Sequence, residues 1–231
     1  MQKETLLIVS THGDEKIGLE AIEQLKKKKL DKFFDYIIAN PKANMENKRF
    51  IEKDLNRSYP GNKKSKYYEE KLAYKNYQIA LKYKYIIDIH EANEGINDFM
   101  IVARNDLGNL FPYERIDLKT ILLWPDPKGP LCGELENAIE LEFGMKNRNR
   151  KKIVAKASLI IENFLKCKKI FKIKSVYKVY GFLPTGSLNQ NQTIKLVDFK
   201  QTKVGNEKFY PLLVNQYLNL GIKCYKMIKN K

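Results

Sequence analysis

Segments with strand-like and helix-like patterns alternate along most of the chain, and this alternation most restricts how it can fold. Short apolar runs rich in β-branched and aromatic residues predict strands, and apolar residues at helical spacing predict helices. The expected strands are residues 5–10, 33–40, 83–90, 99–104, 120–125 and 138–143, and the expected helices are 15–28, 64–82 and 150–166. This order predicts an α/β fold with a mixed, largely parallel central sheet flanked by helices.

The pattern changes near residue 169. Short strand-like segments follow, joined by Gly, Pro and Asn turns, and they include residues 171–187, 192–199 and 207–218. We therefore expect an α/β domain at residues 1–168 and a small β-rich C-terminal subdomain at residues 169–231, packed on the first. A chain of 231 residues is long enough to bury a substantial core.

The sequence lacks the features that mark membrane-spanning, secreted or disulfide-bonded proteins. No run approaches the roughly 20 apolar residues of a membrane span, and the N-terminus has no signal-peptide pattern. The three cysteines, Cys132, Cys167 and Cys224, lie far apart and form no C-x-x-C pair, so neither a disulfide framework nor a thiolate zinc site is expected. We interpret the chain as a cytoplasmic protein without a membrane partner.

The formal charge of +16 is large enough to suggest a polyanionic partner. Nearly all of it comes from scattered lysines, however, and only six residues are arginine, whose planar fork suits base and phosphate recognition. A lysine-rich, solvated surface is therefore favoured over a nucleic-acid interface. A small anionic substrate is compatible with either.

The only two histidines, His12 and His90, each follow an apolar strand-like run. Both are expected at the carboxyl edge of the sheet, where open α/β folds bind ligands. Glu15 lies three residues after His12, and two imidazoles with one carboxylate are the ligand set of a hydrolytic zinc site with one open position. Asp88 could orient such a ligand or pair with a lysine. Alone, the His12–Glu15 spacing is also compatible with a histidine in a turn beside a glutamate that suits the start of a helix.

Residues 39–61 lie between the two histidines and hold two of the six arginines. In a lysine-rich chain, Arg49 and the Asn56–Arg57 pair indicate bidentate recognition of a carboxylate or polarisation of a carbonyl group. The alternative is a surface turn, because the sequence RSYPG that begins at Arg57 has strong turn chemistry.

Four segments carry a family resemblance. In this order, THGDE, ANPKA…KRF…DLNRSYPG, DIH and ELEFG resemble the succinylglutamate desuccinylase and aspartoacylase family of zinc carboxypeptidase-like hydrolases. The resemblance covers roughly residues 5–144, with a fainter match at 207–218. It implies a zinc carboxypeptidase-like fold and one Zn²⁺ per chain, bound by His12, Glu15 and His90.

The same resemblance implies roles for further residues. Arg49 would polarise the scissile carbonyl, Asn56 and Arg57 would bind the substrate carboxylate, and Glu142 in ELEFG would be the general base. Tyr217 is a candidate for a substrate contact. Glu140 and Glu142 leave the same face of their strand, so periodicity does not choose between them, but Glu142 is nearer the carboxyl end, and Glu140 is expected to pair with a lysine or arginine.

The chain also departs from the family pattern. No arginine occurs between Arg115 and Arg148, although aspartoacylases place a further substrate-binding arginine shortly before the catalytic glutamate. This argues against N-acetylaspartate or succinylglutamate as the substrate. Residues 122–137 instead offer Trp124, Lys128 and a loop rich in Gly and Pro as the lining of a differently shaped acyl pocket.

These observations predict a zinc-dependent amidohydrolase that cleaves an N-acyl amino acid or a similar carboxylate-bearing amide. Two alternatives remain. A zinc carboxypeptidase acting on short peptides would use the same residues. A non-catalytic, polyanion-binding protein on a hydrolase scaffold would instead use the basic surface. No feature of the sequence indicates an oligomeric state.

Overall fold

The computed structural model describes residues 3–92, 95, 97–104, 106–108, 110–125, 127–167, 169–187 and 195–230. Its strands are β1 (Thr5–Val9), β2 (Phe34–Ile38), β3 (Tyr85–Ala92), β4 (Asp98–Val102), β5 (Thr120–Leu123), β6 (Ala138–Gly144), β7 (Ser175–Pro184), β8 (Thr202–Val204), β9 (Glu207–Leu212) and β10 (Ile222–Asn230). Its α-helices are α1 (Ile17–Lys27), α2 (Pro41–Glu46), α3 (Tyr68–Ala80), α4 (Leu131–Glu134) and α5 (Arg150–Lys166). None of these helices has the length and apolar character needed to cross a membrane.

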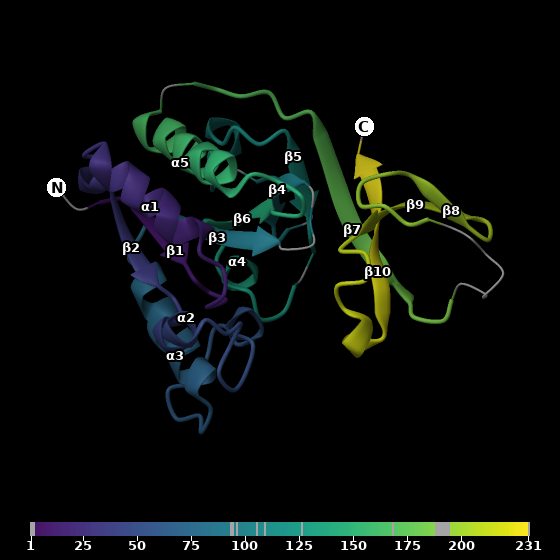
Figure 1. Ribbon diagram of the computed structural model, residues 1–231, viewed down its shortest axis with the longest axis horizontal. Coiled ribbons are helices and arrows are strands. Elements are labelled where there is room, and N and C mark those ends of the chain that lie inside the picture. Colours follow the sequence, from purple (N-terminus) through teal and green to yellow (C-terminus); the bar gives the residue numbers. More distant parts are fainter. Residues whose placement is uncertain are drawn as a thin grey trace.

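The strands form one open, mixed sheet in the order β2-β1-β3-β6-β4-β5-β7-β10-β9-β8 (Figure 1). Strands β2, β1, β3 and β6 are parallel, β4 runs antiparallel to β6, and β5 and β7 run parallel to β4. The expected α/β fold with a mixed, largely parallel sheet is confirmed.

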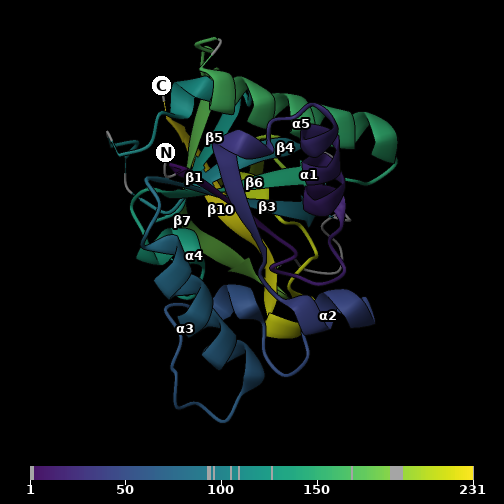
Figure 2. The same ribbon diagram turned by 90° about the vertical axis from the view of Figure 1, so that its left-hand side faces the viewer.

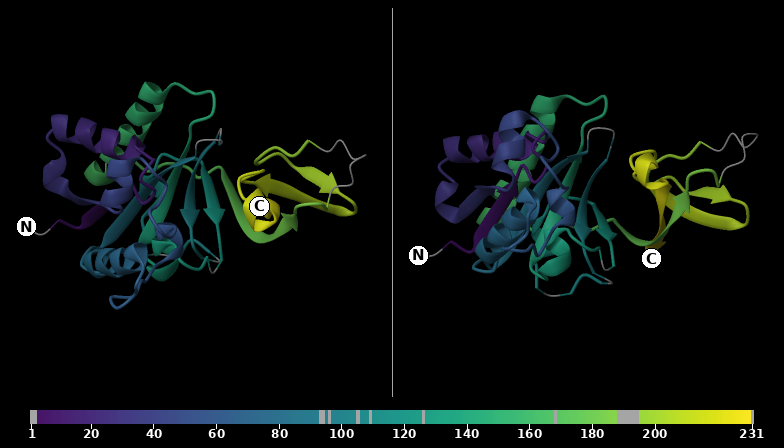
Figure 3. Two further views of the ribbon diagram at one scale, coloured as in Figure 1. Left: turned by 60° about the horizontal axis from the view of Figure 1, so that its bottom comes forward. Right: turned by 90° about the horizontal axis from the view of Figure 1, so that it is seen from below.

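The C-terminal strands continue the central sheet. Strand β7 pairs in parallel with β5, and β10, β9 and β8 follow it as an antiparallel ribbon. Figure 3 shows this ribbon at one side of the α/β part. The division at residue 168 stays a prediction. Of the expected strand at 192–199, residues 195–199 are not in a strand, and the remainder lies outside the described residues.

Helices cover both faces of the parallel strands (Figure 2). Helix α1 packs against α5, and their apolar side chains form the larger core with alternate residues of the strands, such as Leu7, Ile87 and Leu141. The opposite core includes Leu6 and Ile86 together with residues of α3 and α4.

On the face of the sheet that packs against α3 and α4, the side chains of β3 and β6 change from apolar to polar along the strands. Because side chains alternate across a strand, Asp88 and His90 follow Ile86 on this face, and Glu140 and Glu142 follow Ala138. The parallel register places Asp88 beside Glu140 and His90 beside Glu142. The face is therefore apolar near the start of these strands and polar at their carboxyl ends.

Candidate metal centre and substrate pocket

The segment after β1 positions His12 at the carboxyl edge of the sheet. The Thr11 hydroxyl donates to both carboxylate oxygens of Asp88, at 3.0 and 2.9 Å, which ties this segment to β3. A Cβ atom at Gly13 would lie 2.1 Å from the backbone carbon of Ala43, so only glycine fits there. The close approach lets the Gly13 N–H donate to the carbonyl oxygen of Arg49 at 3.1 Å. His12 is thereby held next to the loop that carries Arg49.

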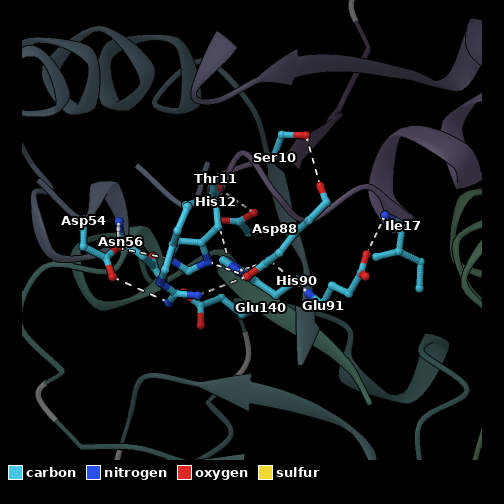
Figure 4. A network of polar contacts seen from close by, with 12 residues as sticks. Ser10, Thr11, His12, Ile17, Asp54, Asn56, Asp88, His90, Glu91 and Glu140 are labelled. Atoms are coloured by element: carbon cyan, nitrogen blue, oxygen red, sulfur yellow. Dashed lines mark hydrogen bonds and ion pairs between the residues drawn. The ribbon is translucent and has the colours of Figure 1, made fainter. Parts of the chain in front are cut away.

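The three predicted metal ligands converge. Glu15 lies just before α1 rather than in its first turn. Its two carboxylate oxygens lie 2.6 Å from Nδ1 of His12 and 3.1 Å from Nδ1 of His90. Figure 4 shows these two imidazoles next to each other, with ring centroids 5.2 Å apart. One ligand atom from each of the three residues lies within 4.8 Å of the other two, and all three side chains are buried.

Two further carboxylates lie beside the Nε2 atoms of the two imidazoles, whereas Glu15 lies beside the Nδ1 atoms. Nε2 of His12 lies 3.1 Å from Asp54, and Nε2 of His90 lies 3.2 Å from Asp88. The Asp88 contact is electrostatic, since the two groups make no well-aligned hydrogen bond. Asp88 therefore faces His90 and Thr11, and no lysine among the described residues pairs with it. A carboxylate that holds one ring nitrogen of a histidine orients the ring so that the other nitrogen can bind a metal.

The electrostatics of this cluster suit a cation. Burial alone would lower the pKa of His12, but the Glu15 and Asp54 carboxylates raise it to about 9. Asp88 and Glu15 raise the pKa of His90 well above its usual value in the same way, against the effect of burial. Without a metal, protons on the imidazoles balance these acids. Two imidazole nitrogens and one carboxylate that converge in this way fit a divalent transition metal such as Zn²⁺.

Glu91, which also forms an ion pair with Arg150, fixes Glu15 relative to the sheet. The Glu91 N–H donates to the Glu15 carboxylate at 3.0 Å. The Glu91 carboxylate accepts from the N–H groups of Lys16 and Ile17 at the start of α1, at 3.1 and 3.0 Å, and from Arg150 at 2.8 Å. The strand predicted at residues 83–90 continues through Ala92, so Glu91 belongs to β3.

A cavity of about 300 Å³ opens beside this cluster. Its lining includes these predicted site residues: His12, Glu15, Arg49, Asn56, Arg57, Glu142 and Tyr217. His90 is not part of the lining, because it is 1% exposed beneath Glu15. The guanidinium group of Arg49 lies 3.6 Å from both Glu15 and Asp54, so it borders the candidate metal ligands.

Asn56 and Arg57 lie in a short 3₁₀ helix, Leu55–Arg57, which Asp54 caps by accepting from the Asn56 N–H. Arg57 donates to the Tyr217 hydroxyl at 3.4 Å and to the Asn56 carbonyl oxygen at 2.8 Å. The Gly129 loop packs on this segment: Gly129 has φ +96°, and a Cβ there would lie 2.5 Å from the Arg57 backbone. The guanidinium group is thus held at the cavity wall.

Glu142 and Glu140 occupy different surroundings. Burial, together with the charges of Glu15 and Glu140, raises the pKa of Glu142 to about 7 against the lowering effect of His90. Glu140 was expected to pair with a lysine or arginine; among the described residues it makes no direct ion pair, although the charge of Arg57 acts on it. Its hydrogen-bond partner is the Asn56 amide, which donates to it at 3.2 Å. The arginine nearest this pair, Arg57, directs its donors to Tyr217 and to the Asn56 backbone instead.

Asp54 and Glu91 were not predicted from the sequence as site residues. Asp54 lies inside the quoted segment DLNRSYPG, and a search for the group that orients His12 could have found it. Glu91 offered no such signal, because its role depends on Arg150, which is 59 positions away in the sequence.

Comparisons with known proteins agree with this arrangement. Residues 1–109 match the family model described as the succinylglutamate desuccinylase/aspartoacylase catalytic domain. No curated protein sequence matches the chain significantly. The matched range includes the three candidate metal ligands and Arg49, Asn56 and Arg57, whereas Glu142 and Tyr217 lie outside it.

Several solved structures share the fold. The succinylglutamate desuccinylase from Chromobacterium violaceum has a TM-score of 0.78 and 15% identity, covering 99% of this chain and 85% of that one. Murine aminoacylase 3 has a TM-score of 0.74 and 17% identity, over 99% and 95% of the two chains. The ectoine utilization protein EutE (DoeB) from Ruegeria pomeroyi has a TM-score of 0.65 and 14% identity, over 99% and 86%.

Proposed function

We propose that the chain is a member of the succinylglutamate desuccinylase/aspartoacylase family of amide-bond hydrolases, whose catalytic-domain model matches residues 1–109, and that it hydrolyses an N-acyl amino acid or a similar carboxylate-bearing amide with the help of Zn²⁺. The observation that carries this proposal is the Glu15 carboxylate, which lies between the Nδ1 atoms of His12 and His90 at the edge of a cavity lined by Glu142 and Arg57. His12, Glu15 and His90 would hold the metal.

The metal would supply Lewis-acid chemistry: when bound, it polarises the amide carbonyl and lowers the pKa of a water molecule. The other groups act through their own contacts with the substrate. Arg57 and Asn56 donate hydrogen bonds to the substrate carboxylate and hold the amide within reach of attack. Arg49 donates to the carbonyl oxygen as that oxygen gains negative charge.

Glu142 moves the proton. Burial raises its pKa to about 7, which suits a group that accepts a proton at neutral pH and gives it up in the same turnover. The carboxylate accepts a proton from the attacking water as the water oxygen bonds to the carbonyl carbon. It then donates that proton to the amine nitrogen as the carbon–nitrogen bond breaks. The products are a carboxylic acid and an amine that retains the bound carboxylate.

The test is a hydrolysis assay on the purified protein, with N-acyl amino acids and dipeptides offered side by side. We expect amine release from N-acyl amino acids, dependent on added Zn²⁺ and lost with a chelator. Cleavage of dipeptides alone would favour the carboxypeptidase alternative. Zinc binding without any hydrolysis would contradict the proposed function.

A further inference from the structure

We propose that the cavity selects amides whose only charge is the carboxylate held by Arg57, and that the rest of the substrate, acyl chain and side chain alike, is uncharged and apolar. This inference rests on the proposed function and specifies its substrate class. It follows from three features of the cavity: which arginines reach it, what forms its floor and what forms its wall.

Four of the six arginines are committed to partners elsewhere. The contacts are Arg104 with Glu136 at 2.5 Å, Arg115 with the Cys167 sulfur at 3.1 Å, Arg148 with Asp98 at 2.5 Å, and Arg150 with Glu91 at 2.8 Å. Among the arginines only Arg49 and Arg57 line the cavity. Arg49 lies against the acids Glu15 and Asp54, which leaves Arg57 as the bidentate donor for one substrate carboxylate.

The side chains at the floor of the cavity disfavour the binding of a substrate with a second carboxylate. Glu140 lines the cavity and is 3% exposed; its hydrogen-bond donor is the Asn56 amide, and in the described part of the chain no lysine or arginine forms a direct ion pair with it, although the charge of Arg57 acts on it from the cavity wall. Cys132 lies beside it, and burial together with the charge of Glu140 raises the pKa of that thiol well above its usual value. A neutral thiol beside a buried acid offers no stabilisation to an anion, and like charges brought together select against the wrong ligand.

The wall of the cavity is apolar and comes from two parts of the chain. Ile101 on β4 lies opposite Glu140 in register, and Trp124 follows β5. Tyr225 on β10 packs on Trp124 with ring centroids 4.6 Å apart, and Leu213 follows β9. These four side chains line the cavity. They provide surface that gains free energy by covering methylene or aromatic groups.

Lys128 is the competing explanation. It is exposed at the cavity, and its ammonium group could serve a second carboxylate in place of the missing arginine. Because an exposed lysine is well hydrated and lacks a planar fork, we do not expect it to offset the repulsion from Glu140.

The experiment compares five amides of glycine, leucine and aspartate. N-acetylleucine and N-butyrylglycine carry an added apolar group, N-acetylaspartate and N-succinylglycine carry a second carboxylate, and N-acetylglycine carries neither. We expect kcat/KM for the apolar pair to exceed that for the acidic pair by on the order of 100-fold. Equal or better turnover of either acidic amide would overturn the inference and leave the proposed function intact.

Binding is measured separately from turnover. Trp124 is the only tryptophan of the chain, so its fluorescence reports ligands at the cavity wall. The apolar amides should change its emission at lower concentration than the acidic amides, with or without added Zn²⁺. This readout tests the inference even if none of the amides is hydrolysed, in which case the proposed function fails and the selectivity stands.

Two substitutions distinguish the contribution of the apolar wall to substrate preference from that of Lys128. Trp124→Ala should raise KM about tenfold for N-butyrylglycine and N-acetylleucine, but much less for N-acetylglycine, because several methylene groups lose their contact. Lys128→Ala should leave the preference for apolar over acidic amides unchanged. If Lys128→Ala selectively removes activity on the acidic amides, Lys128 is a second carboxylate clamp and the inference is wrong.

Discussion

At the scale of single residues, Glu142 and Glu140 are chemically identical and differ in position. Glu142 lies beside His90 in the register of β3 and β6, whereas Glu140 lies one pleat further from the strand ends and accepts from Asn56. We expect Glu142→Gln to lower turnover by about 10²–10⁴-fold with zinc content unchanged, because a general base contributes roughly that factor. Glu140→Gln should lower turnover far less. Turnover and metal content measured on both variants test this, and an inactive Glu140→Gln beside an active Glu142→Gln would show that the base is misassigned.

The arginine of the proposed carboxylate clamp gives a second prediction at this scale. Lysine keeps the charge of Arg57 but loses the fork that reaches both Tyr217 and the Asn56 carbonyl oxygen. Arg57→Lys should therefore weaken substrate binding by about 1.5–3 kcal/mol, the range for hydrogen bonds to charged groups, and should leave zinc content unchanged. KM on a hydrolysed amide is the measurement. A variant with the KM of the wild type would show that Arg57 only shapes the turn.

Much of the site could be predicted because its chemistry depends on rare residue types. With two histidines in the chain, the ends of β1 and β3 were marked as a possible metal site by the sequence itself. Common residues gave less signal. Glu140, Asp54 and Glu91 are acids among many, and each acquires its role from a partner far away in the sequence.

At the scale of elements, Asp98 joins β4 to the end of β6 and to α5. Its side chain is 3% exposed and accepts from Arg148 at 2.5 and 2.8 Å, from Lys156 at 2.6 Å and from the Gly144 N–H at 3.1 Å. Burial alone would raise the pKa of Asp98, but these cations lower it. The folded-state pKa is thus below that of the unfolded chain, so the stabilisation is present above pH about 4 and is lost as the pH falls further.

Asp98→Asn should consequently lower the free energy of unfolding by about 1.5–3 kcal/mol at pH 7, the range for hydrogen bonds to charged groups. The difference from the wild type should shrink at pH 3, where protons weaken the native ion pairs. Denaturant unfolding at the two pH values measures both effects. An equal loss at pH 3 and pH 7 would mean that the carboxylate charge contributes nothing.

The expected long elements of the α/β part were found because their periodic patterns are strong: the apolar spacing at 150–166 matches α5, and 138–143 lies within β6. Two short helices, α2 and α4, were not predicted. Each spans six residues or fewer, which is too short for an apolar stripe to develop. The C-terminal strands were predicted as a class but not as a continuation of the main sheet, because strand pairing is not encoded in local pattern.

At the scale of the whole molecule, the positive charge is dispersed. Lysines 26–29 lie at the end of α1 and are exposed, and the lysines of residues 63–66 lie before α3, on the opposite side of the sheet from α1 (Figure 2). A polyanion would contact one face at a time, so this distribution fits a solvated surface better than a nucleic-acid interface.

The proposed metal should stabilise the whole molecule, because its ligands join two neighbouring strands and the segment before α1. A ligand that binds only the folded state at 100 times its Kd adds about 2.7 kcal/mol to the free energy of unfolding. For a chain of this size that corresponds to a rise in Tm of about 5–10 °C. We expect one Zn²⁺ per chain by metal analysis, and a zinc-dependent rise in Tm that disappears in His12→Ala and in His90→Ala. Glu142→Gln is the matched control, since it removes a charge from the cavity without removing a ligand, and it should keep both the metal and the rise in Tm. If either histidine variant keeps them as well, the metal binds elsewhere, and the hydrolytic site built on His12, Glu15 and His90 is wrong.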